Sequence, residues 1–456
     1  MRGQPQPASG SSIPADVRGR LLRGITASTL SPFVTAAIQL GSVPLLLHAW
    51  GPAKYGDWLI LSAIPSYLTL TDLGFGDASG SDMTVKVASG DREGALATFQ
   101  SSWMLLNVLS IAVLAIVASA VWWPPWQRWL HLSSVASGPA ASTIALLALY
   151  VVVSQQGGIL ESGYRCDGNY AAGTSWATVI RLIEAAAACC VGLATGRFLW
   201  MAASYLALRV VWTLWYERRL RKLSPWLCLG IRHARFRTVR KLALPAGAFV
   251  ALPLGYALSF QGFTILIGAT LGPLAVTAFS TLRTLSRVGV QFVSAISYSV
   301  WPELSRAIGT GDLALARVLH QRSLQVTAFT MLLATLGLWL FGPFAYAHWV
   351  RKTVAFNPLC FHLLLAASVA AALWSANSVV TMSANTHHHI AIGFLLITAL
   401  SIAALRFELP RFGIVGASGM VLAGDLTLIC IALRGALAQL REPLPEFIDG
   451  LCIVRS

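Results

Sequence analysis

The stretch 101–122, SSWMLLNVLSIAVLAIVASAVW, contains 22 residues and no charged side chain. About 20 consecutive apolar residues are enough for an α-helix to cross the hydrocarbon core of a bilayer. The composition extends this pattern to the whole chain, because 56% of the 456 residues are hydrophobic and 11% are charged, with a mean hydropathy of +0.67. Soluble domains carry about 25% charged residues, so the sequence predicts a polytopic integral membrane protein.

Runs of similar length and apolarity recur along the chain between charged or Gly/Pro-containing breaks. These runs are continuously apolar and do not alternate with polar residues, which favours helices over a barrel. We therefore predict an all-α integral membrane protein with about twelve transmembrane helices. The predicted spans are 26–48, 57–80, 101–122, 143–165, 172–195, 199–217, 243–267, 274–300, 325–347, 357–382, 390–406 and 414–433.

The distribution of Lys and Arg predicts the orientation of the spans. The net charge is +15, from 33 basic and 18 acidic residues. If the N-terminus lies inside, inner loops and tails hold about threefold more Lys and Arg than outer loops, as the positive-inside rule requires. We therefore expect both termini to be cytoplasmic, and the basic loops to face anionic membrane lipids rather than nucleic acid.

The chain repeats itself at an offset of 221 residues. The repeated residues mark a kink in a first helix, an outward turn, and an inward loop after a second helix. Six spans per repeat make the two halves parallel, with an expected cavity and substrate site between them. Aligned in this register are Pro32 with Pro253, Gly51-Pro52 with Gly272-Pro273, and Gly90-Asp91 with Gly311-Asp312.

The repeat divides the chain into five predicted parts. These are a flexible cytoplasmic tail (1–25), an N-lobe (26–217), a basic cytoplasmic linker (218–242), a C-lobe (243–433) and a cytoplasmic C-terminal tail (434–456). We expect the linker to be a lipid-facing amphipathic segment. The longest outward loop, from Trp122 to about Ser142, is rich in Trp and is expected to lie at the membrane interface. Asp91 and Asp312 are each expected to cap a short cytoplasmic helix.

The segments 51–58 (GPAKYGDW) and 67–74 (YLTLTDLG), followed by Gly90-Asp91, resemble the N-terminal signature of polysaccharide flippases. These Wzx-like proteins, which move O-antigen or exopolysaccharide precursors, belong to the multidrug/oligosaccharidyl-lipid/polysaccharide exporter superfamily. The resemblance implies a flippase of the bacterial inner membrane. It would translocate an undecaprenyl-pyrophosphate-linked oligosaccharide by alternating access, for lipopolysaccharide or exopolysaccharide biosynthesis. Its implied partners are this lipid-linked oligosaccharide, membrane lipids and a polysaccharide polymerase or ligase complex.

Two arginines of the eighth span are the strongest candidates for binding the cargo. Arg283 and Arg287 lie at i and i+4 on one helix face, and at about 1.5 Å per residue they sit roughly 15–22 Å from the outer turn. A charge at a helix centre costs about 2.5–3.5 kcal/mol on insertion scales, so each needs a partner or a wet cavity. Guanidinium groups bind phosphate in a bidentate fork. The alternative is pairing with an acid such as Asp425 or with backbone carbonyls.

Three other ionisable residues within spans are candidates for function. Arg181 is a candidate substrate-binding residue, although it lies three residues before Glu184 and an intrahelical pair is the simpler interpretation. Arg209 is a second candidate anion contact, or extends to the inner headgroups. Asp425 is a candidate coupling acid that binds a proton or cation, or a partner of an arginine.

Neither a metal site nor a cofactor site is predicted. The run His387-His388-His389 cannot direct three rings at one ion from a helix and is expected to form a polar turn. The seven cysteines form no CxxC pair and are expected to be packing residues.

Three competing functions remain open at this point. A cation-coupled, MATE-like exporter of small molecules is the alternative transporter, for which an acidic cavity is expected. A membrane enzyme such as a polymerase or ligase would need a large outward catalytic loop, whereas the longest here has about 20 residues. A non-transporting scaffold is the third. We predict transport without enzymatic chemistry.

Overall fold

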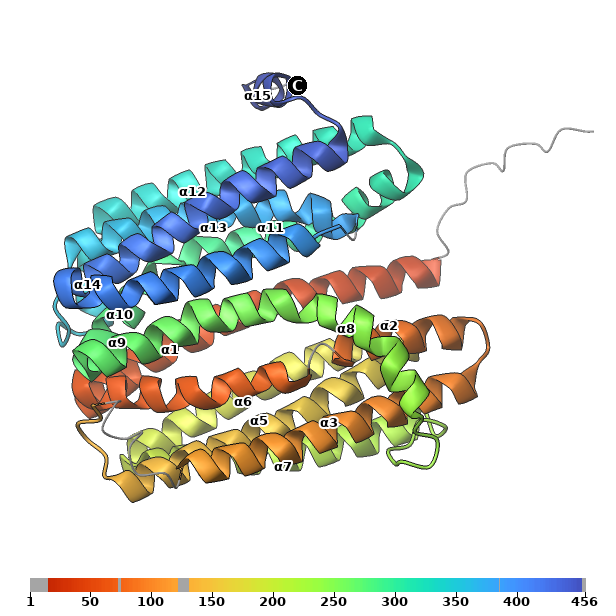
Figure 1. The fold of residues 1–456 in the computed structure, drawn as a ribbon, viewed down its shortest axis with the longest axis horizontal. Coiled ribbons are helices and arrows are strands. Elements are labelled where there is room, and N and C mark those ends of the chain that lie inside the picture. The colour runs from red at the N-terminus through yellow and green to blue at the C-terminus, as the bar shows by residue number, and fades with distance from the viewer. Residues whose placement is uncertain (1–14, 73–74, 122–130, 385, 453–456) are drawn as a thin grey trace, which may run out of the picture.

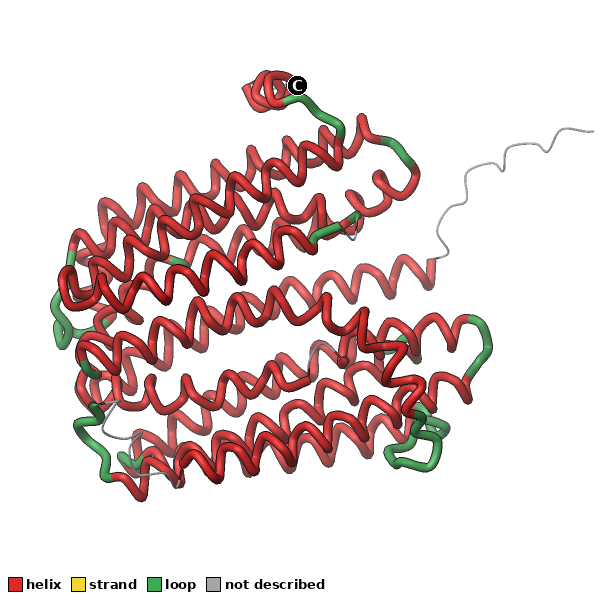
Figure 2. Tube along the Cα trace, in the orientation of Figure 1, coloured by secondary structure: helices red, strands yellow, loops and turns green. Residues whose placement is uncertain are grey.

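The computed structural model describes residues 15–72, 75–121, 131–384 and 386–452. Over these residues the structure contains helices and connecting loops and no strand (Figure 2). The first half contains α1 (Ala15–Ser66), η1 (Tyr67–Asp72), α2 (Phe75–Ala88), α3 (Arg92–Val121), α5 (Ser137–Cys166), α6 (Tyr170–Thr195) and α7 (Phe198–Leu223). The second half contains α8 (Phe236–Ala257), η2 (Leu258–Gly262), α9 (Phe263–Leu271), α10 (Pro273–Ser286), α11 (Val288–Thr310), α12 (Leu313–Trp349), α13 (Pro358–Ser383), α14 (His388–Leu440) and α15 (Leu444–Cys452).

The predicted twelve-span, two-lobe layout is confirmed. Within the described residues, nine helices are long and apolar enough to cross a membrane. Two of these turn back on themselves, α1 at Gly51 (φ 75°) and α14 at Gly413 (φ 56°), so each crosses twice. The remaining pass consists of α10 and α11, which are interrupted only at Arg287. The glycines permit these reversals because a positive φ is strained for residues with a Cβ.

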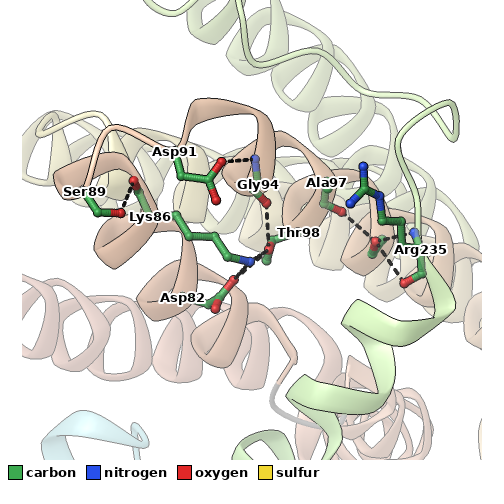
Figure 3. Close-up of polar contacts among 9 residues, drawn as sticks. Asp82, Lys86, Ser89, Asp91, Gly94, Ala97, Thr98 and Arg235 are labelled. Atoms are coloured by element: carbon green, nitrogen blue, oxygen red, sulfur yellow. Dashed lines mark hydrogen bonds and ion pairs between the residues drawn. The ribbon is translucent and has the colours of Figure 1, made fainter.

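The internal repeat is visible in the backbone. Gly51 and Gly272 reverse the chain with φ values of 75° and 81°, and Gly90 and Gly311 with 83° and 79°. After the second pair, the side chain of Asp91 accepts a hydrogen bond from Gly94 N at 2.8 Å (Figure 3). Equivalent residues in the two halves therefore adopt the same conformation, as the aligned sequence predicts.

Both predicted aspartate caps are present, but the helices that they begin are long. Asp312 accepts a hydrogen bond from Leu315 N at 3.0 Å, which matches the cap formed by Asp91. The capped helices, α3 and α12, have 30 and 37 residues. The prediction of short cytoplasmic helices was wrong, because each helix continues without interruption from its cap into the apolar span that follows.

The two lobes share their largest hydrophobic core at one end of the molecule. We call the end that carries Gly51 and Gly272 the turn end, at the left of Figure 1, and the opposite end, which carries residues 224–235, the linker end. Near the turn end, Tyr55 and Leu61 of the N-lobe belong to the same buried cluster as Phe279 of the C-lobe. Toward the linker end, the two largest buried clusters belong to one lobe each, around Tyr164 and around Leu304, and only a small cluster joins the lobes there.

The first helix of each lobe also packs on the second helix of the other lobe. Phe33 of α1 contacts Phe292 of α11, with ring centroids 5.6 Å apart. In the other direction, Val239 of α8 is buried with Phe75 and Ala78 of α2. The first helix of each lobe therefore packs against both lobes.

Several predicted segment boundaries differ from the structure. Residues 1–14 and 122–130, which include the start of the expected tail and the Trp-rich loop, lie outside the described residues. Helix α1 begins at Ala15, within the segment expected to be a flexible tail. The expected C-terminal tail is also largely helical, and α15 packs on α12 with the Phe447 ring 5.5 Å from His320.

The basic linker is a docked loop between two long helices. Helix α7 ends at Leu223 and α8 begins at Phe236. Between them, Gln100 of α3 donates to the Cys228 carbonyl at 3.1 Å and accepts from His233 N at 2.7 Å. The backbone of Arg235 lies against the same helix and donates to Ser101 Oγ at 2.8 Å (Figure 3). These polar contacts with α3 fix the loop to the N-lobe. The expected contact of the basic linker with membrane lipids stays a prediction.

Candidate interlobe anion site

A cavity of about 470 Å³ lies between the two lobes, on the linker side of their shared core. One wall comes from the two arms of α1, and the other from η2, α9, α10 and α11. Arg283 and Arg287 both line it, and no Asp or Glu is among its described lining residues. The polar side chains that accompany them are Gln39, Ser42, Tyr55, Gln261, Thr264, Ser280, Thr281, Thr284 and Gln291. This wall offers hydrogen bonds and positive charge without negative charge.

Arg283 is buried and held by the π-helical turn η2. Its Nη1 donates to the Ser259 carbonyl at 2.7 Å and its Nη2 to Ser259 Oγ at 3.0 Å. Its guanidinium carbon lies 4.1 Å from the centre of the Phe260 ring. The residue is 6% exposed, and its Nε has no partner among the described residues. Because the π turn interrupts the regular helical ladder, it presents Ser259 and Phe260 together to this one guanidinium.

Arg287 occupies the junction between α10 and α11 and is the freer of the two arginines. Its guanidinium carbon is 5.1 Å from the Phe260 ring, so Phe260 contacts both cations. Within the described part of the chain, its side chain has no hydrogen bond or ion pair. The predicted common face of the two arginines is therefore present, with Arg283 positioned by the protein and Arg287 available to a ligand.

Asp425 lies near the arginines but does not pair with them. Its Oδ1 accepts a hydrogen bond from Trp374 Nε1 at 3.0 Å. It lines a small pocket of about 20 Å³ together with Ser259. No ion pair joins it to either arginine among the described residues. Of the two predicted alternatives for Arg283, the contact with a backbone carbonyl is the one observed.

The other arginines predicted to bind cargo lie outside this cavity. Arg209 of α7 forms an ion pair with Glu184 of α6 at 2.5 Å, with 12% and 2% of their side chains exposed. The Tyr150 hydroxyl accepts from Arg209 and donates to Glu184, both at 3.2 Å. Arg181 is exposed on α6 and donates to Thr178 Oγ1 at 3.4 Å. Glu184 thus pairs with a residue 25 positions away in the sequence, a contact that helical spacing did not predict.

We expect the Arg209–Glu184 pair to contribute strongly to stability. Glu184→Ala leaves a buried guanidinium without a counter-charge, which costs about 3–5 kcal/mol and lowers the unfolding temperature of the detergent-solubilised protein. The double variant Glu184→Gln, Arg209→Met removes both charges and is expected to recover most of that loss. Equal destabilisation by the single and double variants would contradict this interpretation.

The signature segment 51–58 builds the closed turn end. The buried Asp57 accepts hydrogen bonds from the backbone of Ser133 and Ser134, at 3.2 and 2.6 Å. Gly56 lies so close to α10 that a Cβ would overlap the Pro273 carbonyl. Next to this contact, Thr277 Oγ1 donates to the Pro52 carbonyl at 2.7 Å. The segment therefore joins the lobes and anchors the loop that carries Ser133 and Ser134. Its charged side chains do not line the cavity that contains the two arginines.

Sequence reasoning missed Ser259 and Phe260. Both lie within an apolar run, where a serine and a phenylalanine carry no distinctive signal. The only hint is that Gly262, at the end of η2, aligns with Gly41 in the repeat. His387 lies in the expected turn before α14, whereas His388 and His389 are the first two residues of that helix. No group of three metal-ligating side chains occurs among the residues the structure describes.

No family model matches the sequence, and no curated protein matches it. Several solved structures are similar to the chain. An inward-facing multidrug-resistance MATE family transporter of the MOP superfamily is 12% identical, with 91% of this chain and 98% of that chain covered and a TM-score of 0.73. A Vibrio cholerae MATE transporter is 16% identical, with 95% and 99% covered and a TM-score of 0.62.

A third similar structure is a MOP superfamily transporter from Pyrococcus furiosus. It is 13% identical, with 92% of this chain and 95% of that chain covered and a TM-score of 0.64. It is described as having a binding pocket of reverse polarity, which suggests a different function for it. At such identities the likeness concerns the fold. The twelve passes and the two lobes are arranged as in these proteins, and the chain has the fold of the MATE transporters of the MOP superfamily.

Proposed function

We propose that this protein is an alternating-access flippase that moves a saccharide linked through pyrophosphate to a polyprenyl lipid, across a bacterial inner membrane. The observation that carries this proposal is the guanidinium of Arg287. It faces an interlobe cavity and has no ion pair or hydrogen bond in the described part of the chain. A cation at membrane depth needs a compensating partner, and a pyrophosphate would supply it through charge-assisted hydrogen bonds.

The shape of the lobe interface supports an amphipathic cargo. The cavity encloses polar side chains and two cations between the lobes, which suits a hydrophilic headgroup. The lipid tail would remain in the bilayer at the gap between the lobes, so that only the headgroup has to be shielded from hydrocarbon. No covalent step is required. The protein needs only to change conformation so that the cavity opens first to one side of the membrane and then to the other.

The closed turn end supports a state that loads cargo from the linker end. The lobes share one core near Gly51 and Gly272 and have separate cores toward the linker. The predicted orientation makes the linker end cytoplasmic, where a lipid-linked precursor would enter. The TM-score is 0.73 against an inward-facing MATE structure and 0.65 against an outward-facing one, which agrees with this assignment.

A second candidate is a cation-coupled exporter of small molecules. It is favoured by the names of the similar structures, which are multidrug-resistance and other MATE transporters, and by Asp425 as a candidate coupling acid near the cavity. The arginine-lined wall without described acids disfavours a cationic drug as the cargo. The reversed pocket polarity of the Pyrococcus furiosus transporter is a precedent within the fold for a non-cationic cargo.

Reconstitution with two cargos separates the candidates. The full-length protein is placed in phospholipid vesicles with either a fluorescent polyprenyl-pyrophosphate-linked tetrasaccharide or the cationic dye ethidium. We expect the lipid-linked saccharide to change leaflets, measured by its accessibility to an external glycosidase, and ethidium to stay where it is. Movement of ethidium alone would overturn the proposal in favour of the exporter. Protein-free vesicles and vesicles with heat-denatured protein provide the background rate.

A further inference from the structure

A second cavity, of about 240 Å³, lies within the C-lobe between α8, α11, α13 and the start of α14. We call it the C-lobe recess. It lies in the half of the lobe nearest the linker end, since Ser378 and Met382 line it shortly before α13 ends at Ser383. Its lining residues are Leu252, Tyr256, Ser294, Ser297, Trp301, Trp374, Ser375, Ser378, Val379, Met382, His387 and Ile390.

The lining combines aromatic rings with hydroxyl groups and carries no carboxylate, ammonium or guanidinium among the described residues. The three rings are Tyr256, Trp301 and Trp374, and four serines accompany them. The one titratable imidazole, His387, has its pKa lowered by burial and by the neighbouring His388, so it is neutral at pH 7. A charged ligand would find no counter-charge here, whereas a neutral ligand with many hydroxyl groups would find both hydrogen bonds and flat apolar surfaces.

Two polar atoms of the recess lack partners. Ser297 is 9% exposed, and its hydroxyl forms no hydrogen bond to a described residue. The Nδ1 atom of His387 is also buried and without a partner in the described chain. Buried polar atoms are nearly always hydrogen-bonded in folded proteins. Both unsatisfied atoms belong to residues that line the recess, so a ligand that draws these side chains toward it would supply the missing bonds.

The recess and the arginine site are lined by successive turns of α11. Gln291 lines the interlobe cavity, Ser294 lines the recess one turn later, and Trp301 follows two turns after that on the same face. From Arg287 to Ser294 the rise is about 10 Å, and to Trp301 about 21 Å. A ligand could therefore extend from the guanidinium of Arg287 to the aromatic rings without leaving this helix face.

On the other side, a small pocket lies between a residue of the recess and the residues that hold Arg283. Trp374 lines the recess and donates to Asp425 at 3.0 Å. Asp425 shares its small pocket with Ser259, whose carbonyl and hydroxyl hold Arg283. The orientation of Trp374 is thus tied to the residues that position the arginine pair.

We propose that the C-lobe recess binds a neutral sugar ring of the saccharide whose pyrophosphate lies at Arg287. A pyranose presents an apolar C–H face that can lie on Trp301 or Trp374, and a rim of hydroxyls that can pair with Ser297 and His387. This inference rests on the proposed function and adds to it a specific place, in the C-lobe, where the sugar is recognised.

Two lipid probes distinguish the recess from the anion site. One is the polyprenyl-pyrophosphate-linked neutral tetrasaccharide, and the other is the same lipid pyrophosphate with a short alkyl-linked dye in place of the saccharide. In full-length protein in vesicles, Ser297→Ala is expected to lower flux of the first probe about 2- to 12-fold, the value of one neutral hydrogen bond. Trp301→Ala is expected to lower it about tenfold. Neither variant is expected to change flux of the dye-bearing probe.

Trp301→Phe and Trp339→Ala complete the comparison. Phenylalanine keeps an aromatic face at position 301, so it should restore most of the flux of the saccharide probe. Trp339 is 57% exposed on α12, so its replacement controls for the loss of a tryptophan. Equal effects of Ser297→Ala and Trp301→Ala on both probes, or no effect on either, would overturn the proposal. Wild-type protein that moves neither probe would instead refute the proposed function, on which the recess depends.

Discussion

Arg287→Ala is expected to lower flux of the pyrophosphate-linked saccharide by about 10- to 150-fold while protein levels stay normal. A hydrogen bond to a charged group contributes about 1.5–3 kcal/mol, and each 1.4 kcal/mol corresponds to a factor of ten. Because the Arg287 side chain forms no hydrogen bond or ion pair within the described residues, its removal should affect the cargo more than the fold. The measurement is initial flux in vesicles that contain equal amounts of protein.

Charge and geometry can be separated at the same position. Arg287→Lys keeps the positive charge but loses the planar fork that suits a phosphate, so its flux should lie between wild type and alanine. Arg406 is exposed on α14, and Arg406→Ala is the matched control with unchanged flux. Full transport by Arg287→Ala would remove the anion site from the proposal. Arg283→Ala should lose transport as well, but also disturb η2, so it is the less specific variant.

Gly56→Leu is expected to prevent the turn end from closing. The side chain would collide with the Pro273 backbone, which lies against Gly56 in the closed interface. Overpacking a tight contact costs about 1–3 kcal/mol, which shifts the ratio of closed to open molecules by about 5- to 150-fold. Transport should fall in the same proportion, because alternating access requires each end to close in turn.

The shift can be followed with a cysteine at position 277. Thr277 is fully buried and contacts Pro52, so Thr277→Cys should react slowly with a membrane-impermeant maleimide in an otherwise native protein, and faster when Gly56→Leu is added. Gly337 lies in α12 with open space around its Cα, so Gly337→Leu is the control and should leave the rate unchanged. An unchanged labelling rate in the Gly56→Leu protein would contradict the assigned closure.

The sequence was sufficient for the fold because a membrane imposes strong local rules. Apolar runs mark the passes, and the pairs Gly51 with Gly272 and Gly90 with Gly311 mark equivalent turns that need a positive φ. Segments outside the membrane lack that constraint. The docking of residues 224–235 on Gln100 depends on side chains far apart in the sequence, which periodicity cannot predict.

The candidate site was only partly predictable for a related reason. Arg283 and Arg287 stand out because charge is rare in an apolar run, and their spacing gave the common face. The residues around them could not be identified from the sequence. Ser259 and Phe260 contact the arginines because they lie in the π-helical turn η2, which packs against α10. Arg209 stands out equally in the sequence but is neutralised by Glu184 in the structure. A charged residue in an apolar run can therefore be identified from the sequence as a candidate for binding. Only the tertiary contacts show whether that residue already has an ion-pair partner within the protein.

The contact of each first helix with the opposite lobe limits how the molecule can move. Since α1 rests on α11 and α8 rests on α2, the two bundles cannot pivot as separate rigid bodies without straining these crossing helices. The strain must be absorbed by bending, and η2 is the irregular point of the seventh span. Arg283 grips that point. An anion that binds the Arg283 guanidinium would therefore change how easily the helix bends at η2. Binding of the anion and bending of the seventh span would then be coupled through the same residues.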